Sequence, residues 1–98
     1  MEVIRHVTIR GRVQGVGYRA WTQYKALRQG VAGWVRNRRD GSVEAVFAGS
    51  AEEVARMIAA CHRGPRGALV ETVDEVPGSP EILEARRQGE QFSVLATL

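Results

Sequence analysis

At 98 residues the chain is long enough for one modest hydrophobic core, and its length predicts a single domain over residues 1–98. Apolar residues make up 44% and charged residues 26%, as in an ordinary globular protein, and no stretch is long and apolar enough to span a membrane. The net charge of +3 is uneven: residues 1–39 hold nine basic residues and one acidic residue, a net +8, whereas residues 40–98 hold five basic and ten acidic residues, a net −5. The first part should therefore attract small anions.

Hydrophobic periodicity divides the chain into strands and helices that are separated by short turns. Apolar and polar side chains alternate in the predicted strands, whereas apolar residues recur every three or four positions in the predicted helices. In chain order the sequence predicts a strand at 3–9, a helix at 18–29, strands at 31–36 and 42–47 joined by a turn at 37–41, a helix between Ser50 and Gly64, and strands at 68–76 and 92–95.

The first predicted helix follows directly on a glycine-rich loop. Its inward stripe is expected to consist of Ala20, Tyr24 and Leu27, and Val31 should continue that stripe beyond the helix. Gly30 is the natural residue to end this helix, because glycine readily takes the left-handed backbone conformation found after many helices.

The second predicted helix has the clearest boundaries. Ser50 can cap its N-terminus, Glu53 three residues later completes a capping box, and Gly64-Pro65 ends it. Its expected core stripe comprises Val54, Met57, Ile58 and Cys61. Cys61 is the only cysteine, so we expect a buried free thiol and, by default, the reducing cytoplasm as the location.

The order of these elements is β-α-β-β-α-β with one further strand. Two helices placed between antiparallel strands can cover one face of a single sheet. The sequence therefore predicts an α+β fold of the ferredoxin-like, split β-α-β sandwich kind, with a mostly antiparallel sheet and both helices on one face.

The segment GRVQGVGYR, from Gly11 to Arg19, carries the strongest functional signal. Gly15 and Gly17 allow positive φ angles, so the backbone can approach a ligand closely. The next helix begins near Tyr18, so free N–H groups and the positive end of the helix dipole point at the same spot. Arg19 adds a planar guanidinium, and the result is a metal-free cradle for a phosphate-sized anion.

Two common nucleotide-binding patterns do not fit this loop. Residues 15–20 match the loose dinucleotide pattern G-x-G-x-x-G/A, but that pattern expects an acidic residue about 20 positions further on, where Val35 stands. The P-loop pattern fails because Gly17 is followed by Tyr18 rather than by Lys-Ser/Thr. Neither a dinucleotide cofactor nor a nucleotide with its Mg²⁺ is therefore expected.

An RNA-recognition module of the same topology would stack bases on aromatic residues of its central strands. The third predicted strand offers only Phe47, and arginines without a stacking platform are weak evidence for RNA binding. No Cys-x-x-Cys is present, and no cluster of acids and histidines has metal-ligand spacing. His6 lies in a strand and His62 at a helix end, so a structural role explains both better than catalysis.

An enzyme of this composition needs a substrate that requires little acid–base help. An acyl phosphate fits this limit, because its leaving group is a carboxylate whose conjugate acid has a pKa of about 4. That group departs without being protonated, whereas a phosphate ester of an alcohol needs a general acid or a metal.

GRVQGVGYR at residues 11–19 and GWVRNRRDGSV at residues 33–43 resemble the two sequence motifs of the acylphosphatase family. Supporting matches are Trp21-Thr22-Gln23 and GPRGALV at residues 64–70. The resemblance covers residues 3–76, and it is specific because two separate motifs agree in order and spacing; residues 77–98 are less typical. It implies hydrolysis of an acyl phosphate to a carboxylate and inorganic phosphate, without cofactor or metal.

The resemblance also implies roles for individual residues. Arg19 would bind the phosphoryl group together with backbone N–H groups of the loop, and Asn37 would position the attacking water. The loop residues implied are Gln14, Gly15, Val16, Gly17, Tyr18 and Arg19. In isolation Asn37 would be interpreted as a turn residue, since it precedes the hairpin signal Asp40-Gly41, but its occurrence together with the loop favours the catalytic role.

Two hypotheses are kept for the function. The favoured one is a cytoplasmic, monomeric enzyme of the acylphosphatase kind, whose partners are an acyl phosphate and inorganic phosphate, the latter as product and inhibitor, with no membrane or nucleic acid. The alternative is a non-catalytic RNA- or anion-binding module of the same topology. Arg19 together with Asn37 favours the enzyme, whereas exposed strand aromatics would favour the RNA-binding module.

Overall fold

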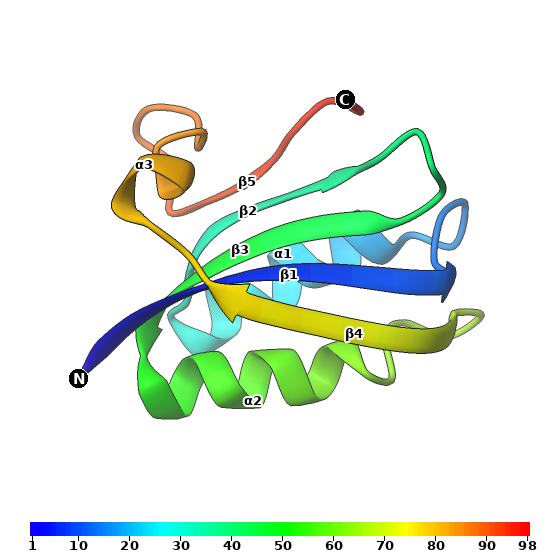
Figure 1. The fold of residues 1–98 in the computed structure, drawn as a ribbon, viewed down its shortest axis with the longest axis horizontal. Helices are drawn as coiled ribbons and strands as arrows, with labels where there is room; N and C mark the ends of the chain where they lie inside the picture. The colour runs from blue at the N-terminus through cyan, green and yellow to red at the C-terminus, as the bar shows by residue number, and fades with distance from the viewer.

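The computed structural model describes all residues from Met1 to Leu98. Its elements are β1 (Glu2–Arg12), α1 (Tyr18–Gln29), β2 (Ala32–Asn37), β3 (Val43–Ser50), α2 (Ala51–Cys61), β4 (Leu69–Pro77), α3 (Pro80–Leu83) and β5 (Phe92–Val94). The five strands form one sheet in the order β4-β1-β3-β2-β5, in which only β2 and β5 run parallel (Figure 1). No helix is long and apolar enough to cross a membrane.

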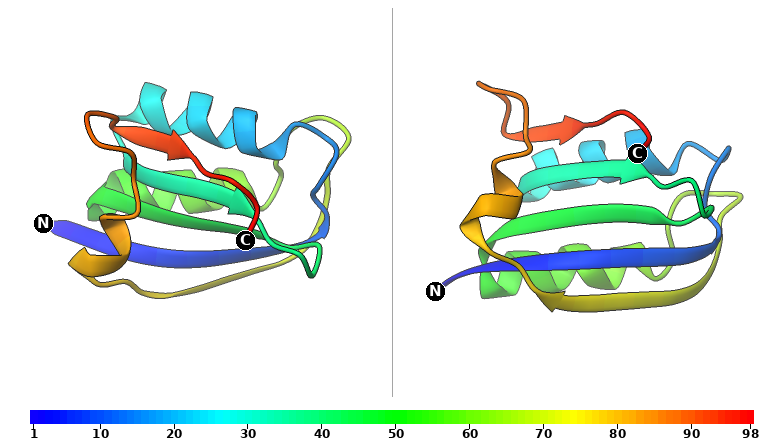
Figure 2. Two further views of the ribbon diagram at one scale, coloured as in Figure 1. Left: turned by 90° about the horizontal axis from the view of Figure 1, so that it is seen from above. Right: turned by 45° about the horizontal axis from the view of Figure 1, so that its top comes forward.

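Two helices cover one face of this sheet, and the predicted ferredoxin-like arrangement is confirmed. Figure 2 shows α1 and α2 side by side on the same face, with α3 at the end of the sheet on the opposite side. The strand β1 is longer than the predicted range of 3–9, because it continues to Arg12. A shift of register against β4 between Arg10 and Gly11 lets this end of β1 turn towards the loop that follows.

The main core lies between the sheet and the two long helices. The strands contribute alternate residues to it, because successive side chains point to opposite faces of a sheet. Its largest fully buried members are Tyr18, Phe47, Phe92, Ile9 and Met57. Truncating such a side chain to alanine costs about 2–5 kcal/mol, so this layer holds the loop ends in place.

The helix α1 occupies the predicted residues, but the predicted inward stripe is wrong. Tyr24 is 58% exposed and Leu27 is 48% exposed, and Ala20 is exposed as well. The buried positions are Tyr18, Thr22 and Ala26, followed as expected by the buried Val31. Burial of Thr22 is possible because its hydroxyl donates to the carbonyl of Tyr18 at 2.8 Å. The Tyr24 ring instead lies at the surface under the guanidinium of Arg28.

The helix α2 agrees with its predicted boundaries and core stripe. The hydroxyl of Ser50 accepts a hydrogen bond from the backbone N–H of Glu53 at 3.1 Å, although the Glu53 carboxylate makes no return bond, so the capping box is half formed. Val54, Met57, Ile58 and Cys61 are all buried. The helix ends at Cys61, and Gly64 follows with a φ of 65°.

The short helix α3 lies between the predicted strands at 68–76 and 92–95, where the sequence predicted no helix. It covers Trp34, whose indole N–H donates to the carbonyl of Ile82 at 2.7 Å. The guanidinium of Arg36 lies 4.7 Å from the centre of the same ring. The face of the sheet opposite α1 and α2 therefore carries a second, smaller buried cluster at one end, and Trp34 is fully buried.

Candidate active site

The loop between β1 and α1 has the backbone geometry that the sequence predicted. Gly15 has a φ of 75° and Gly17 a φ of 79°, both in the left-handed region, and Gly17 is the N-cap of α1. A Cβ at either position would meet no atom within 4 Å, so only the backbone conformation requires glycine there. The first helical hydrogen bond runs from Trp21 to the Gly17 carbonyl, which leaves the preceding backbone N–H groups without helical acceptors.

These N–H groups border a cavity of about 330 Å³. Loop residues form one side, α1 forms a second side, and the ends of β2 and β5 close it. The lining residues are Val13, Gln14, Gly15, Gly17, Tyr18, Arg19, Ala20, Gln23, Asn37 and Val94. The structure thus brings together all the predicted site residues except Val16, whose side chain packs against the core.

Arg19 is the cation of this cavity. Its side chain forms no ion pair and no hydrogen bond within the chain, and the first turn of α1 has no acidic residue. Its charge is therefore free to meet an anion that lies at the helix N-terminus, where the helix dipole acts in the same direction.

Asn37 is the last residue of β2, and its side-chain amide lines the same cavity. Its Oδ1 atom is buried and has no hydrogen-bond partner. Its backbone carbonyl, in contrast, accepts from the N–H of Leu98 at 3.3 Å, which holds the strand end in place. Because buried acceptors are nearly always paired, this oxygen points to an O–H or N–H donor that enters with a ligand or water.

The turn that follows Asn37 is held by several hydrogen bonds. Gln14 donates from its side-chain Nε2 to the carbonyls of Arg38 and Ser42, both at 2.8 Å. The carboxylate of Asp40 accepts from the hydroxyl and the backbone N–H of Ser42 at 2.6 and 2.9 Å, and these bonds lower the pKa of Asp40 to about 2. The Asp40-Gly41 hairpin signal is therefore confirmed, since β2 and β3 pair on either side of this turn.

The arginines that flank Asn37 have a partner on the other face of the sheet. Glu44 accepts from Arg36 at 2.7 Å and from Arg38 at 3.2 Å, and its second oxygen lies 2.6 Å from Nε2 of His6. Burial by itself would raise the pKa of Glu44, but the hydrogen bonds from Arg36 and His6 outweigh it and lower that pKa. Both guanidinium groups thus share one carboxylate, unlike Arg19, which has none.

None of the side chains that could act as a general acid or base stands free in the cavity. The hydroxyl of Tyr18 donates to the Cys61 carbonyl at 2.6 Å, and burial raises the pKa of both residues, that of Cys61 to about 12. His6 is paired with Glu44, and His62 lies at the end of α2. No cluster of three or more His, Cys, Asp or Glu side chains could hold a metal ion.

Four residues of the cavity were not predicted as part of the site, and one of them, Val13, directly precedes the predicted loop. Gln23 donates from Nε2 to the Phe92 carbonyl at 3.0 Å and so joins α1 to β5, while Val94 comes from β5 itself. Ala20 was expected in the core but faces the cavity from the exposed side of α1. Gln23 belongs to the supporting match Trp21-Thr22-Gln23, but nothing in the sequence signals Val94, which becomes a neighbour of the loop only when β5 docks beside β2.

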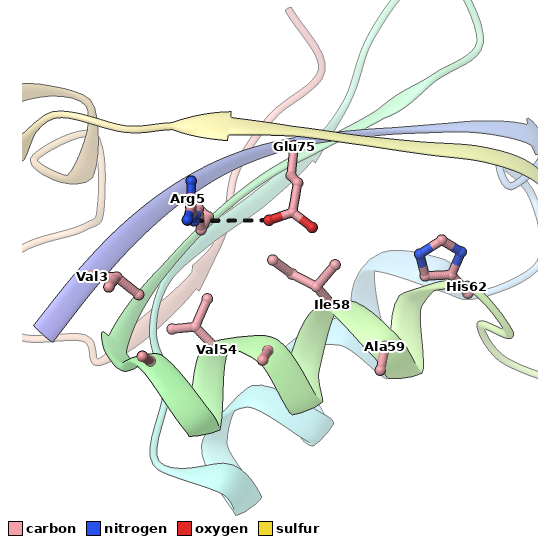
Figure 3. A pocket seen from close by; sticks show the side chains of 9 residues that line it. Val3, Arg5, Val54, Ile58, Ala59, His62 and Glu75 are labelled. Atoms are coloured by element: carbon pink, nitrogen blue, oxygen red, sulfur yellow. Dashed lines mark ion pairs between the residues drawn. The ribbon is translucent and has the colours of Figure 1, made fainter. Parts of the chain in front are cut away.

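A second hollow of about 350 Å³ lies between α2 and the strands β1 and β4 (Figure 3). Its walls are mostly apolar, with Val3, Val54 and Ile58 among them. Arg5 and Glu75 form an ion pair across it, with Nε and Oε1 3.7 Å apart. This groove has no loop of free N–H groups and no unpaired cation of the kind found around Arg19.

Comparison with known proteins gives one consistent result. The acylphosphatase family model matches residues 5–92. A protein of Rhodopseudomonas palustris (strain BisB18) named acylphosphatase is 60% identical over 98% of this chain and 97% of its own length, and a Nitrobacter winogradskyi acylphosphatase is 58% identical over 99% and 98%. The structure of an acylphosphatase from Coxiella burnetii superposes with a TM-score of 0.83 at 30% identity, covering 96% of this chain and 93% of that one.

Proposed function

Because this chain belongs to the acylphosphatase family and is an enzyme that hydrolyses acyl phosphates, we propose that the reaction takes place in the cavity beside the β1–α1 loop. The loop from Gln14 to Arg19 holds the phosphoryl group through its backbone N–H groups and the Arg19 guanidinium. Asn37 holds the attacking water. The observation that carries this proposal is the convergence of a helix N-terminus, an unpaired guanidinium and an unpartnered amide oxygen in one cavity.

The loop and Arg19 act on the charge of the transferring group. In phosphoryl transfer the negative charge is spread over the equatorial oxygens, and fixed donors aimed at those oxygens lower the barrier without having to reorganise. The left-handed glycines set the N–H groups in place, and Arg19 supplies a full positive charge with a planar fork of donors.

Asn37 acts on the nucleophile. A side-chain amide can both accept an O–H from water and donate to the phosphoryl oxygens, and the Oδ1 of Asn37 has no partner within the chain. Because the water is held in line with the leaving group, the reactants do not have to reach this orientation by random encounter, and the entropic part of the activation barrier falls.

Proton transfer needs no protein side chain in this scheme. A phosphate oxygen of the substrate takes the proton of the attacking water. The leaving carboxylate departs unprotonated, because its conjugate acid has a pKa of about 4. Three other titratable side chains are poorly suited to proton transfer, which supports this scheme. The pKa values of Tyr18 and Cys61 are raised, and His6 is paired with Glu44.

The test is the release of phosphate from a simple acyl phosphate by the purified protein. We expect hydrolysis that continues in excess chelator and that inorganic phosphate inhibits competitively. Complete loss of activity under chelation, restored by Mg²⁺ or Zn²⁺, would contradict the proposed metal-independent reaction. Non-competitive inhibition by phosphate would place its binding outside the catalytic cavity.

The non-catalytic RNA-binding alternative is not favoured. The aromatics of the central strands are unavailable for base stacking, because Phe47 lies in the core under the helices and Trp34 is buried under α3. We also propose that the chain acts as a single domain over residues 1–98 and as a cytoplasmic monomer. The buried, unpaired thiol of Cys61 supports a reducing location, and sedimentation measurements test the monomer.

A further inference from the structure

Two turns that are far apart in the sequence meet beside the cavity. One is the β1–α1 loop, and the other is the turn between β2 and β3 that follows Asn37. The side chain of Gln14 joins them, because its Nε2 donates at 2.8 Å to the carbonyl of Arg38 and at 2.8 Å to the carbonyl of Ser42. Arg38 directly follows Asn37, the last residue of β2. Gln14 therefore holds the backbone immediately next to the residue that carries the side-chain amide of the site.

The turn does not need Gln14 in order to close. The carbonyl of Ser42 already accepts from the N–H of Arg38 at 2.8 Å, and the carbonyl of Arg38 accepts from the N–H of Gly41 at 3.2 Å. Asp40 adds its own bonds to Ser42. The two bonds from Gln14 are therefore not needed to form the β2–β3 turn. They fix the distance between this turn and the β1–α1 loop.

No other hydrogen bond connects these two turns. Arg10 does reach Asp40 at 3.4 Å, but it does so from β1, outside the loop, and both side chains are more than half exposed. The sheet beneath the cavity and the bond from Leu98 to the Asn37 carbonyl also help to place Asn37, but Gln14 is the one side chain that joins the phosphate loop directly to the turn after Asn37.

We infer that the side chain of Gln14 is a positioning residue that sets Asn37 at the correct distance and angle from the phosphate loop. This inference rests on the proposed roles of the loop and of Asn37. It adds a side-chain function to a residue whose backbone alone was assigned to phosphate binding. Misplacing a catalytic group by about 1 Å can cost on the order of 10²-fold in rate, so the expected effect is on kcat.

The first experiment replaces Gln14 with alanine. We expect kcat to fall about tenfold or more, while the inhibition constant of inorganic phosphate changes less than about twofold, because the backbone N–H groups remain. The matched control is Gln91→Ala, since Gln91 Nε2 also joins two segments by donating to a carbonyl, that of Val31 at 3.3 Å, but away from the cavity. That control should keep the wild-type kcat. Equal kcat losses in both variants would overturn the inference.

Two further measurements separate positioning from general stability. In an Asn37→Ala background, Gln14→Ala should add little further loss, because the group that it positions is gone. In Gln14→Glu the carboxylate cannot donate, but protonation restores one donor, so its kcat relative to the wild type should rise between about pH 7 and about pH 5. A full additional loss in the double variant, or a constant ratio across this range, would overturn the inference.

The outcomes also distinguish this inference from the proposed function. If Asn37→Ala keeps the wild-type kcat, the proposed role of Asn37 fails, and with it the reason for positioning that residue. If Asn37→Ala is impaired while Gln14→Ala keeps the wild-type kcat, the proposed function stands and the positioning role of Gln14 is wrong.

Discussion

The two largest hollows of the protein have nearly equal volumes, about 330 Å³ beside the β1–α1 loop and about 350 Å³ between α2 and the sheet. In the groove along α2, Arg5 and Glu75 neutralise one another above apolar walls (Figure 3). In the loop cavity, Arg19 has no carboxylate partner and Asn37 has an oxygen without a hydrogen bond.

The difference shows that volume does not distinguish a reaction site from a packing irregularity. What distinguishes the loop cavity is polar chemistry without partners in the chain: loop N–H groups and an unpaired guanidinium line it, and Asn37, whose Oδ1 is buried without a hydrogen bond, lines it as well. A buried acceptor that is left unpaired costs stability, so this combination is best explained by a ligand that binds here.

The largest expected effect comes from removing the free charge. Arg19→Ala should lower kcat/KM on the order of 10²-fold or more, because both the charge and its planar fork are lost at the phosphoryl group. Lysine at the same position should restore little, since it lacks the fork. Steady-state kinetics measure this, and phosphate inhibition should weaken in parallel.

The matched control for that variant lies in the other hollow. Arg5→Ala removes an arginine that is already paired and partly exposed, so kcat/KM should stay within about twofold of the wild type. A larger loss in Arg5→Ala than in Arg19→Ala would reverse the assignment of the two hollows.

The second effect concerns the unpartnered amide. Asn37→Ala should lower kcat on the order of tenfold to 10²-fold and leave phosphate inhibition nearly unchanged, because the water is oriented mainly in the transition state. Asn37→Asp should be severely impaired as well, since it places a negative charge beside the phosphoryl group and removes the amide donor. An active Asn37→Asp variant would indicate a general base instead, and a variant that fails in phosphate binding alone would require a different role.

A smaller effect is expected from the loop glycines. Gly15→Ala and Gly17→Ala meet no steric obstacle, so their cost comes from the left-handed φ, about 1–2 kcal/mol of backbone strain. If the loop relieves that strain by turning its N–H groups away, phosphate should bind several-fold more weakly. Variants that lose stability but bind phosphate normally once folded would show a purely structural role.

The smallest effect on catalysis is expected at Glu44, where the charges are paired as they are in the groove. The pKa of Glu44 is lower in the folded protein than in the unfolded chain. Its carboxylate therefore stabilises the fold at pH values above the ordinary pKa of glutamate, and this contribution is lost as the pH falls through the lowered pKa. Glu44→Gln should therefore unfold more easily than the wild type at neutral pH, by about 1–2 kcal/mol, and the difference should shrink in acid. Urea denaturation at two pH values measures this, and a difference that grows in acid would contradict it.

The loop cavity was largely predictable from the sequence because its determinants are local. Two glycines with positive φ, a helix that begins at Tyr18 and an arginine in its first turn all lie within a few residues, so no contact with a distant segment is needed to bring them together. The capped helix α2 was predictable for the same reason, since Ser50 and Glu53 are three residues apart.

What the sequence did not reveal depends on contacts between distant segments. The predicted inward face of α1 was wrong for two reasons. Thr22 is buried because its hydroxyl is hydrogen-bonded to the Tyr18 carbonyl, whereas the larger Tyr24 stays at the surface, where its ring contacts the guanidinium of Arg28. No periodicity marks α3, which spans Pro80–Leu83 and is placed by a bond from Trp34. Long-range partners decide these cases, and residue type alone does not show them.

The order of strands in the sheet has a consequence for how the protein is made. The first strand, β1, lies inside the sheet, and one of its neighbours is β4, where Arg5 pairs with Pro77. Most of the chain must therefore leave the ribosome before β1 gains that neighbour. Pairings between such distant segments slow folding, so refolding should take milliseconds or longer rather than the microseconds of a small helical bundle. The phosphate loop, although encoded near the start of the chain, gains the last wall of its cavity only when Val94 has been synthesised.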